Sequence, residues 1–126
     1  DRSPSRGLGD VYKRQLQDYV RLSFTTEHPM MYVAMKDGRI SNPVILRIDP
    51  SVVYLQHTMY ADMNATTTKR TPNIGKSLED FKKIHFSTVK AHKHFDLDEN
   101  ERPYFQAEVM VMTFIPKKYI INLDTF

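Results

Sequence analysis

The sequence predicts an α+β domain, a fold class in which strands and helices are mixed without regular alternation. Short segments with an apolar residue at every second position indicate half-buried strands. Between these segments, Pro, Asp, Ser and Gly stand where short helices begin and end. The pattern does not repeat as the strand–helix–strand units that a parallel sheet requires. At 126 residues, the chain is long enough for one small domain with a modest core.

Residues 1–15, "DRSPSRGLGDVYKRQ", are rich in Ser, Arg and Gly and show no apolar periodicity. "SRGLGDVYKRQ" resembles the translated sequencing adapter found at the start of metagenome-derived fragments. We therefore expect an artefact or a disordered tail here, followed by a domain over 16–126 that is truncated at its N-terminus. The alternative is a real basic arm that contacts nucleic acid. This stretch has four Lys or Arg and two Asp, so the net charge of +3 leaves +3 − 2 = +1 for residues 16–126.

Three elements are expected in the first half of the domain. Residues 19–24, "YVRLSF", alternate apolar and polar side chains as a half-buried strand does. A helix is expected over 29–38, because Pro suits its first position and Gly its end. The nearly continuous apolar run in "NPVILRIDP" (42–50) predicts a central strand, and the Asp–Pro pair that closes it predicts a helical turn over 50–55.

Residues 58–77 begin as a strand and continue as a long polar loop. A loop of this length in so small a domain is more often functional than idle. Ser77, followed three residues later by Asp80, approximates a capping box and predicts a helix over 78–86. A charged connector follows over 89–102.

The strand expected over 104–114 carries an anomalous carboxylate. Glu108 stands directly before the apolar run "VMVMTF", where a carboxylate must be partnered, exposed at an edge or retained for chemistry. Strand alternation places Gln106 on the same face, so the two side chains are expected to line a shared cleft. A short turn after Pro116 and a last strand over 119–126 complete the domain.

Several kinds of site are excluded by composition. With no cysteine there is no disulfide, thiolate zinc site or thiol nucleophile, and with four glycines there is no phosphate-binding glycine loop. No apolar run approaches the roughly 20 residues that cross a bilayer. One cluster has the spacing of metal ligands: His92, His94, Asp96 and Asp98. Its place in a charged connector indicates a solvated surface, so no metal is expected.

The long loop leaves two interpretations open. Its basic residues are suited either to phosphate contacts or to simple solubility: Lys69, Arg70 and Lys76. In "ADMNA" (61–65), Asp62 and Asn64 are typical of a turn, where they satisfy local backbone donors.

Three motifs occur in the order found in one known family. "DYVRLSFTTEHPMMY", "MYADMNA" and "RPYFQAEVMVMTFIP" resemble the DarT family of DNA ADP-ribosyltransferases, and the resemblance covers residues 18–126. It implies a compact ADP-ribosyltransferase fold, with a split β-sheet core and short helices around a cleft for NAD. The implied reaction moves ADP-ribose from NAD to a base in single-stranded DNA. The implied biology is a bacterial toxin with a DarG-like macrodomain antitoxin, acting in the cytoplasm as a monomer, without a membrane.

The resemblance also assigns roles to residues. Glu108 corresponds to the catalytic glutamate, which would stabilise the positive charge that builds on the ribose as nicotinamide departs. The residues implied to contact NAD are His28, Met30, Tyr32 and Gln106. Those implied, more weakly, to contact the DNA are Asp62, Asn64, Lys69 and His85.

Two departures from the family pattern matter. The thymine-modifying branch carries an arginine where this chain has Glu27, which favours the guanine-modifying branch. The family's N-terminal segment, which grips nicotinamide, should precede Asp18, so the chain is expected to be weak or inactive by itself. The rival hypotheses are the same chemistry on RNA or protein, and a non-catalytic module that binds nucleic acid or a partner.

Overall fold

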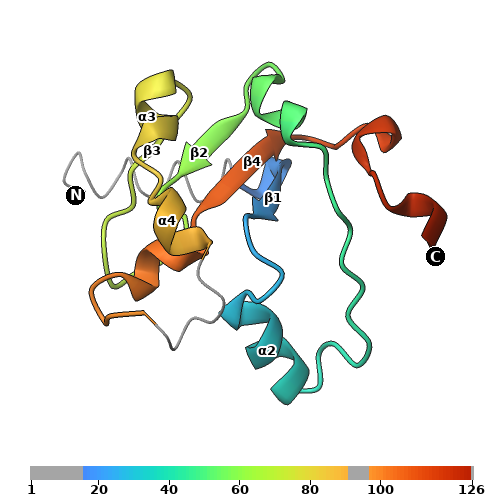
Figure 1. Cartoon of the computed structure of the whole chain (residues 1–126), viewed down its shortest axis with the longest axis horizontal. Coiled ribbons are helices and arrows are strands. Elements are labelled where there is room, and N and C mark those ends of the chain that lie inside the picture. Colours follow the sequence, from blue (N-terminus) through green and yellow to red (C-terminus); the bar gives the residue numbers. More distant parts are fainter. Residues whose placement is uncertain (1–15, 91–96, 126) are drawn as a thin grey trace, which may run out of the picture.

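The computed structural model describes residues 16–90 and 97–125. Its centre is an antiparallel sheet of four strands in the order β1-β4-β2-β3 (Figure 1). The strands are β1 (Tyr19–Ser23), β2 (Met59–Ala61), β3 (Ile74–Gly75) and β4 (Glu108–Met112). The α-helices are α2 (Pro29–Lys36), α3 (Leu78–Lys82) and α4 (Phe86–Val89). The predicted α+β class is confirmed.

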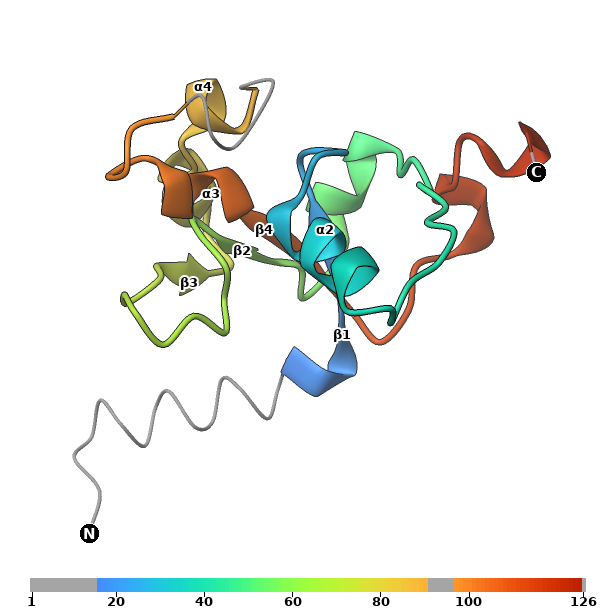
Figure 2. The same cartoon turned by 90° about the horizontal axis from the view of Figure 1, so that it is seen from below.

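Short 3-10 helices make up most of the remaining regular structure. They are η1 (Leu16–Asp18), η2 (Pro50–Tyr54), η4 (Arg102–Gln106), η5 (Lys117–Tyr119) and η6 (Leu123–Thr125). In both Figure 1 and Figure 2, α3, α4 and η4 lie on the β3 side of the sheet, whereas the C-terminal segment lies on the β1 side.

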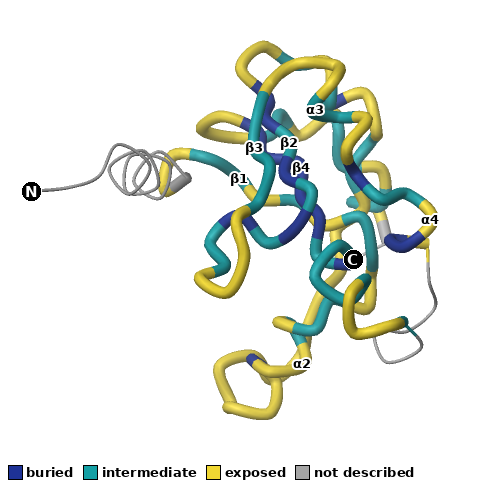
Figure 3. The backbone as a smooth tube through the Cα atoms, turned by 90° about the vertical axis from the view of Figure 1, so that its left-hand side faces the viewer, coloured by how far each residue is buried: buried dark blue, intermediate teal, exposed yellow. Residues whose placement is uncertain are grey.

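Strand β4 is the centre of the core, and Figure 3 shows the buried backbone concentrated along it. Met110, which is fully buried, packs on one face with Met59 of β2. Val109 and Val111 point to the other face, where they pack with Val52. Because side chains alternate along a strand, Glu108 lies on the Met110 face, next to a wholly apolar cluster.

The helix starts are formed as the sequence predicts. The His28 side chain accepts a hydrogen bond from the Met30 N–H and caps α2. Asp49 caps η2 by accepting from the Ser51 N–H. Ser77 and Asp80 form a complete capping box at α3. Local signals of this kind depend on neighbours in the chain, which is why sequence alone identifies them.

Two predicted strands are absent from the part of the chain that the structure describes. There, residues 42–50 and 119–125 make one isolated bridge, between Ile48 and Ile120, and no regular strand. Two backbone hydrogen bonds join these segments, from the Asp49 N–H to the Tyr119 carbonyl and from the Ile121 N–H to the Arg47 carbonyl. The Asn122 side chain adds bonds to the Arg47 N–H and the Ile45 carbonyl. Val44 therefore lies 61% exposed, although its apolar run is typical of a central strand.

Two other predicted elements have different bounds. The helix expected over 78–86 is broken between α3 and α4. The strand expected from residue 104 begins at Glu108, because Pro103 opens η4 and the chain stays helical through Gln106. Gln106 is therefore not on a strand face, and the alternation argument that paired it with Glu108 is wrong.

Candidate active site

Glu108 is buried, with 7% of its surface exposed, and its carboxylate is held by Arg21. Arg21 Nε donates to Oε1 and Nη2 donates to Oε2, each at 2.8 Å, which is the bidentate geometry of a strong ion pair. Strand register produces this contact. Arg21 pairs with Met110 and Ser23 pairs with Glu108, so Arg21 and Glu108 are diagonal neighbours on one face.

The turn that follows β2 provides the second support. The Ala65 N–H donates to Glu108 Oε2 at 2.7 Å. Asn64 Oδ1 accepts from Arg21 Nη2 at 2.9 Å and from the Thr66 N–H at 3.0 Å. An Asn that bonds the backbone two residues on fixes a tight turn, so the predicted turn is also part of the site.

Gln106 joins the same network by another route. Its Oε1 accepts from Asn64 Nδ2 at 3.4 Å. The end of η4 thus presents Gln106 beside the Asn64 turn, and the chain continues directly into Glu108. The structure therefore brings together three of the predicted site residues, Asn64, Gln106 and Glu108.

Sequence reasoning missed Arg21 and Thr66. Arg21 reads as an ordinary solvent-facing residue of an alternating strand, and Thr66 as one of several threonines in a polar loop. The pairing register of β1 with β4 is the signal that identifies Arg21, and this register is not visible in either segment alone.

Asp62 and Lys69 lie further out in the loop after β2. Asp62 Oδ1 accepts from the Asn73 N–H at 2.8 Å, and the Asp62 N–H donates to the Asn73 carbonyl. Asp62 thus closes the base of the loop. These bonds support the interpretation of Asp62 as a residue that satisfies local backbone donors. Lys69 is exposed. The role of either residue in binding DNA stays a prediction.

The other residues predicted to contact NAD lie on the segment that leaves β1. This segment starts at Ser23, the residue that pairs with Glu108. His28 is half-buried at the start of α2, and Met30 and Tyr32 are 47% and 48% exposed. The Tyr32 hydroxyl donates to Glu27. Their contact with NAD stays a prediction.

His85 belongs to a separate cluster. Its ring stacks on Tyr104, with 3.6 Å between the ring centroids and 9° between the planes. His85 Nδ1 lies 3.1 Å from Glu101 Oε2, which also accepts from the Thr88 hydroxyl at 2.8 Å. The pKa of Glu101 is lowered, mainly by the hydrogen bond with His85 and next by the hydrogen bond from Thr88. The charges of His85 and Arg70 lower this pKa further.

This lowered pKa predicts an acid-dependent loss of stability. A carboxyl whose folded pKa lies below its unfolded value stabilises the fold above the unfolded value, and the contribution disappears as pH falls through the folded pKa. We expect E101Q to melt below the wild type at neutral pH, with the gap closing as pH falls below the ordinary carboxyl pKa of 4.5. Thermal unfolding across this range measures the gap. The exposed Glu99 provides the control, E99Q, and a gap of constant size would contradict the assignment.

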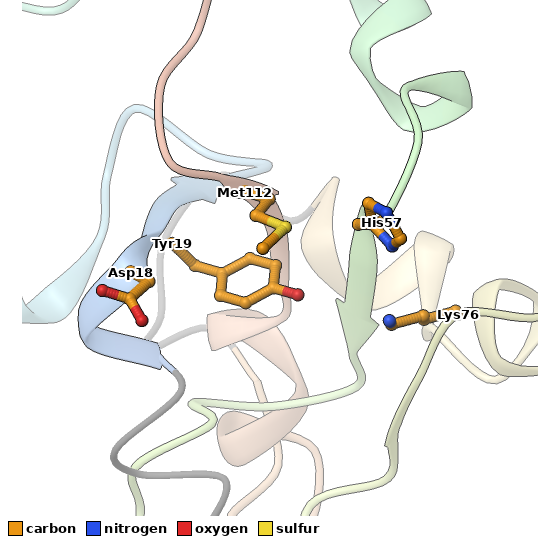
Figure 4. Close-up of a pocket in the computed structure, with 5 residues that line it drawn as sticks. All are labelled: Asp18, Tyr19, His57, Lys76 and Met112. Carbon is orange, nitrogen blue, oxygen red and sulfur yellow. The ribbon is translucent and has the colours of Figure 1, made fainter.

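A cavity of about 220 Å³ lies at the far end of the β1–β4 pair (Figure 4). Tyr19 and Met112, which pair with each other, line it together with Asp18, His57 and Lys76. Glu108 lies at the opposite end of the same ladder, so this cavity is separate from the carboxylate network.

The metal-like cluster of the sequence falls mostly outside the described residues, which include only Asp98 of its four members. Within residues 16–90 and 97–125, no group of three or more His, Cys, Asp or Glu is placed to hold a metal ion. None of the helices in these ranges is long and apolar enough to cross a membrane.

Comparison with known families identifies the fold around this network. The family model described as "ssDNA thymidine ADP-ribosyltransferase, DarT" matches residues 7–125. The chain belongs to the DarT family. The resemblance seen in the three sequence motifs is thereby confirmed, and Glu108 lies in the last of them, "RPYFQAEVMVMTFIP".

A solved structure, Thermus sp. 2.9 DarT in complex with carba-NAD+, has a similar fold. The TM-score is 0.61 at 18% sequence identity, and the similarity covers 83% of this chain and 56% of that chain. The present chain therefore spans just over half the length of that DarT. Among curated proteins, none matches the chain.

Proposed function

We propose that this chain carries the catalytic glutamate of a NAD-dependent ADP-ribosyltransferase that modifies a base in single-stranded DNA. The observation that carries the proposal is the buried carboxylate of Glu108, held by two charge-assisted bonds from Arg21 and one backbone bond from Ala65, in a member of the DarT family. A carboxylate fixed in this way is already oriented before substrate arrives.

The chemistry is a displacement at the ribose carbon that bears nicotinamide. The bond from this carbon to the nicotinamide nitrogen breaks, and its electron pair leaves with nicotinamide, which thereby becomes neutral. A nitrogen of the base then bonds to the same carbon. The anion of Glu108 stabilises the positive charge on the ribose, and the proton lost by the base goes to Glu108 or to water.

The surrounding residues have distinct proposed roles. Arg21 and Asn64 position Glu108 and do not themselves react. Gln106, which ends η4 beside Asn64, is proposed to contact NAD, together with His28, Met30 and Tyr32 on the segment that leaves β1. Asp62 and Lys69 are proposed to contact the DNA from the loop after β2.

Guanine is the proposed acceptor base. The reason is Glu27, which stands where the thymine-modifying branch carries an arginine, although the matching family model is described by thymidine. We expect label from ³²P-NAD to enter single strands that contain guanine more than single strands that contain only thymine and cytosine. Mass spectrometry of the digested product identifies the modified base. Labelling confined to thymine would contradict this choice and leave the ADP-ribosyltransferase proposal standing.

A toxin–antitoxin role is part of the proposal. ADP-ribose on DNA blocks base pairing, so an unopposed transferase harms its own cell. We propose a macrodomain hydrolase as the antitoxin, encoded beside this chain. Treatment of the labelled DNA with a macrodomain hydrolase should release the label, and resistance to it would count against such a partner.

One observation favours a second function. A bidentate Arg21–Glu108 pair is also what a purely structural carboxylate would make, which fits a non-catalytic module that binds nucleic acid or a partner. The same fold acting on RNA or protein is a nearer alternative. Incubation of the chain with labelled NAD and, in parallel, single-stranded DNA, duplex DNA, RNA and protein separates these possibilities. Label in single-stranded DNA alone is the expected result, at a low level, and robust labelling would overturn the expectation that the chain is weak or inactive by itself.

A further inference from the structure

Asn73 joins the base of the loop after β2 to helix α3. Its N–H donates to Asp62 Oδ1 at 2.8 Å, and its carbonyl accepts from the Asp62 N–H at 3.2 Å. Its side chain reaches α3, where Nδ2 donates to Asp80 Oδ1 at 3.0 Å and Oδ1 accepts from Lys83 Nζ at 3.2 Å. We call Asp62, Asn73 and Asp80 the loop clamp.

The α3 end of the loop clamp is fixed in place. Asp80 Oδ2 accepts from the Ser77 N–H at 3.1 Å and from the Ser77 hydroxyl at 2.7 Å. The same carboxylate lies directly against Gly75 of β3, and a methyl group at position 75 would overlap it. Because glycine has no Cβ, Asp80 can hold this position against the backbone of β3.

Helix capping does not account for the bond between Asn73 and Asp80. The capping box of α3 is complete with Ser77 and Asp80, and it uses Oδ2 of the Asp80 carboxylate. The bond to Asn73 uses the other oxygen, Oδ1. Sheet pairing does not account for the bond either, because Asn73 lies before β3 begins at Ile74. The bond therefore holds the loop.

The loop clamp is close in the chain to the turn that supports Glu108. Asp62 is two residues before Asn64, whose side chain accepts from Arg21. The next residue, Ala65, donates its N–H to Glu108 Oε2 at 2.7 Å. A loop that is closed at its base has fewer conformations than an open one, so the clamp restricts the backbone that enters this turn. The position of the Ala65 N–H therefore depends on the clamp.

We infer that Asn73 is a positioning residue for Glu108. It acts through Asp62 and the Asn64 turn, and its side chain couples helix α3 to the geometry of the carboxylate. The catalytic meaning of this role rests on the proposed function, whereas the effect of Asn73 on the Ala65 N–H is measurable without NAD or DNA.

Amide hydrogen exchange of the whole chain, followed by NMR without NAD, tests this role at the Ala65 N–H. We expect N73A to speed the exchange of this amide about tenfold, which corresponds to losing the net stabilisation of about one hydrogen bond. The amides of the β1–β4 ladder should keep their wild-type rates. G75A should have the same effect by another route, because the added methyl group displaces the Asp80 carboxylate. N42A is the matched control, since Asn42 is exposed and lies outside the loop.

An Ala65 exchange rate in N73A within twofold of the wild type would overturn the proposal. Equal acceleration of the Ala65 amide and the ladder amides would overturn it too, because Asn73 would then support the whole fold and not the turn. Failure of the proposed function is a different result, since ADP-ribose transfer is measured separately with NAD. A chain whose Ala65 amide responds as expected and that transfers nothing keeps the positioning role of Asn73 and loses the enzyme.

Discussion

E108Q lowers the rate of ADP-ribose transfer by about 10²- to 10³-fold, which is the loss typical when a group that stabilises transition-state charge is neutralised. Glutamine keeps the volume of glutamate, and its carbonyl oxygen still accepts from the Ala65 N–H, which Glu108 accepts at 2.7 Å in the wild type. Because E108Q also breaks the ion pair with Arg21, circular dichroism must show that the variant is folded, and the transfer rate then reports the loss of the anion. Transfer of ³²P from NAD to a single-stranded oligonucleotide measures the rate, and growth of expressing cells measures the relief of toxicity.

E79Q is the matched control, because Glu79 is an exposed glutamate in the first turn of α3. Its transfer rate should equal that of the wild type. If E108Q transferred label as fast as E79Q, Glu108 would be structural and the non-catalytic binding module would be the better interpretation.

R21Q is expected to lower the free energy of unfolding by about 2 kcal/mol. The substitution leaves a buried carboxylate without its cation, which costs roughly 3–5 kcal/mol in a fully buried pair and roughly 0–1 kcal/mol in an exposed one. The Arg21–Glu108 pair lies between these cases, since 32% of the Arg21 side chain and 9% of the Glu108 side chain are exposed. Urea denaturation followed by circular dichroism measures the change.

The chain contains a suitable exposed pair for comparison. Arg39 and Asp37 form an ion pair at 3.2 Å with 60% and 54% of their side chains exposed, so R39Q should cost under about 1 kcal/mol. The double variant R21Q/E108Q should lose less free energy of unfolding than the two single variants lose together, because it leaves neither charge unpaired. Strict additivity, or an R21Q effect no larger than that of R39Q, would contradict the positioning role of Arg21.

The parts of the site that sequence identified are those with a local signature. Glu108 was conspicuous because a carboxylate interrupts an apolar strand, and Asn64 because Asn in a small-residue stretch predicts a turn. The α2 start and the Ser77 capping box were predictable for the same reason. Each of these signals extends over only a few residues of the chain.

The parts that sequence missed depend on pairing across the chain. Arg21 reaches Glu108 only because β1 and β4 pair in one particular register, and 87 residues separate them. The run 42–50 has the composition of a buried strand, but its pairing with the C-terminal segment is limited to one isolated bridge with two backbone bonds, beside which the Asn122 side chain bonds the Arg47 N–H and the Ile45 carbonyl. Apolar composition indicates what a strand would bury, and not whether a partner strand is present.

The most direct test follows both halves of NAD in one reaction. NAD labelled in the adenylate and, in a parallel reaction, in nicotinamide is incubated with the chain and single-stranded DNA. The wild type is predicted to place adenylate label in the DNA and to release nicotinamide label in equal amounts, and E108Q to do neither. Nicotinamide release without labelled DNA, or equal labelling of DNA by E108Q and the wild type, would contradict the assignment of Glu108 as the catalytic residue of a DNA ADP-ribosyltransferase.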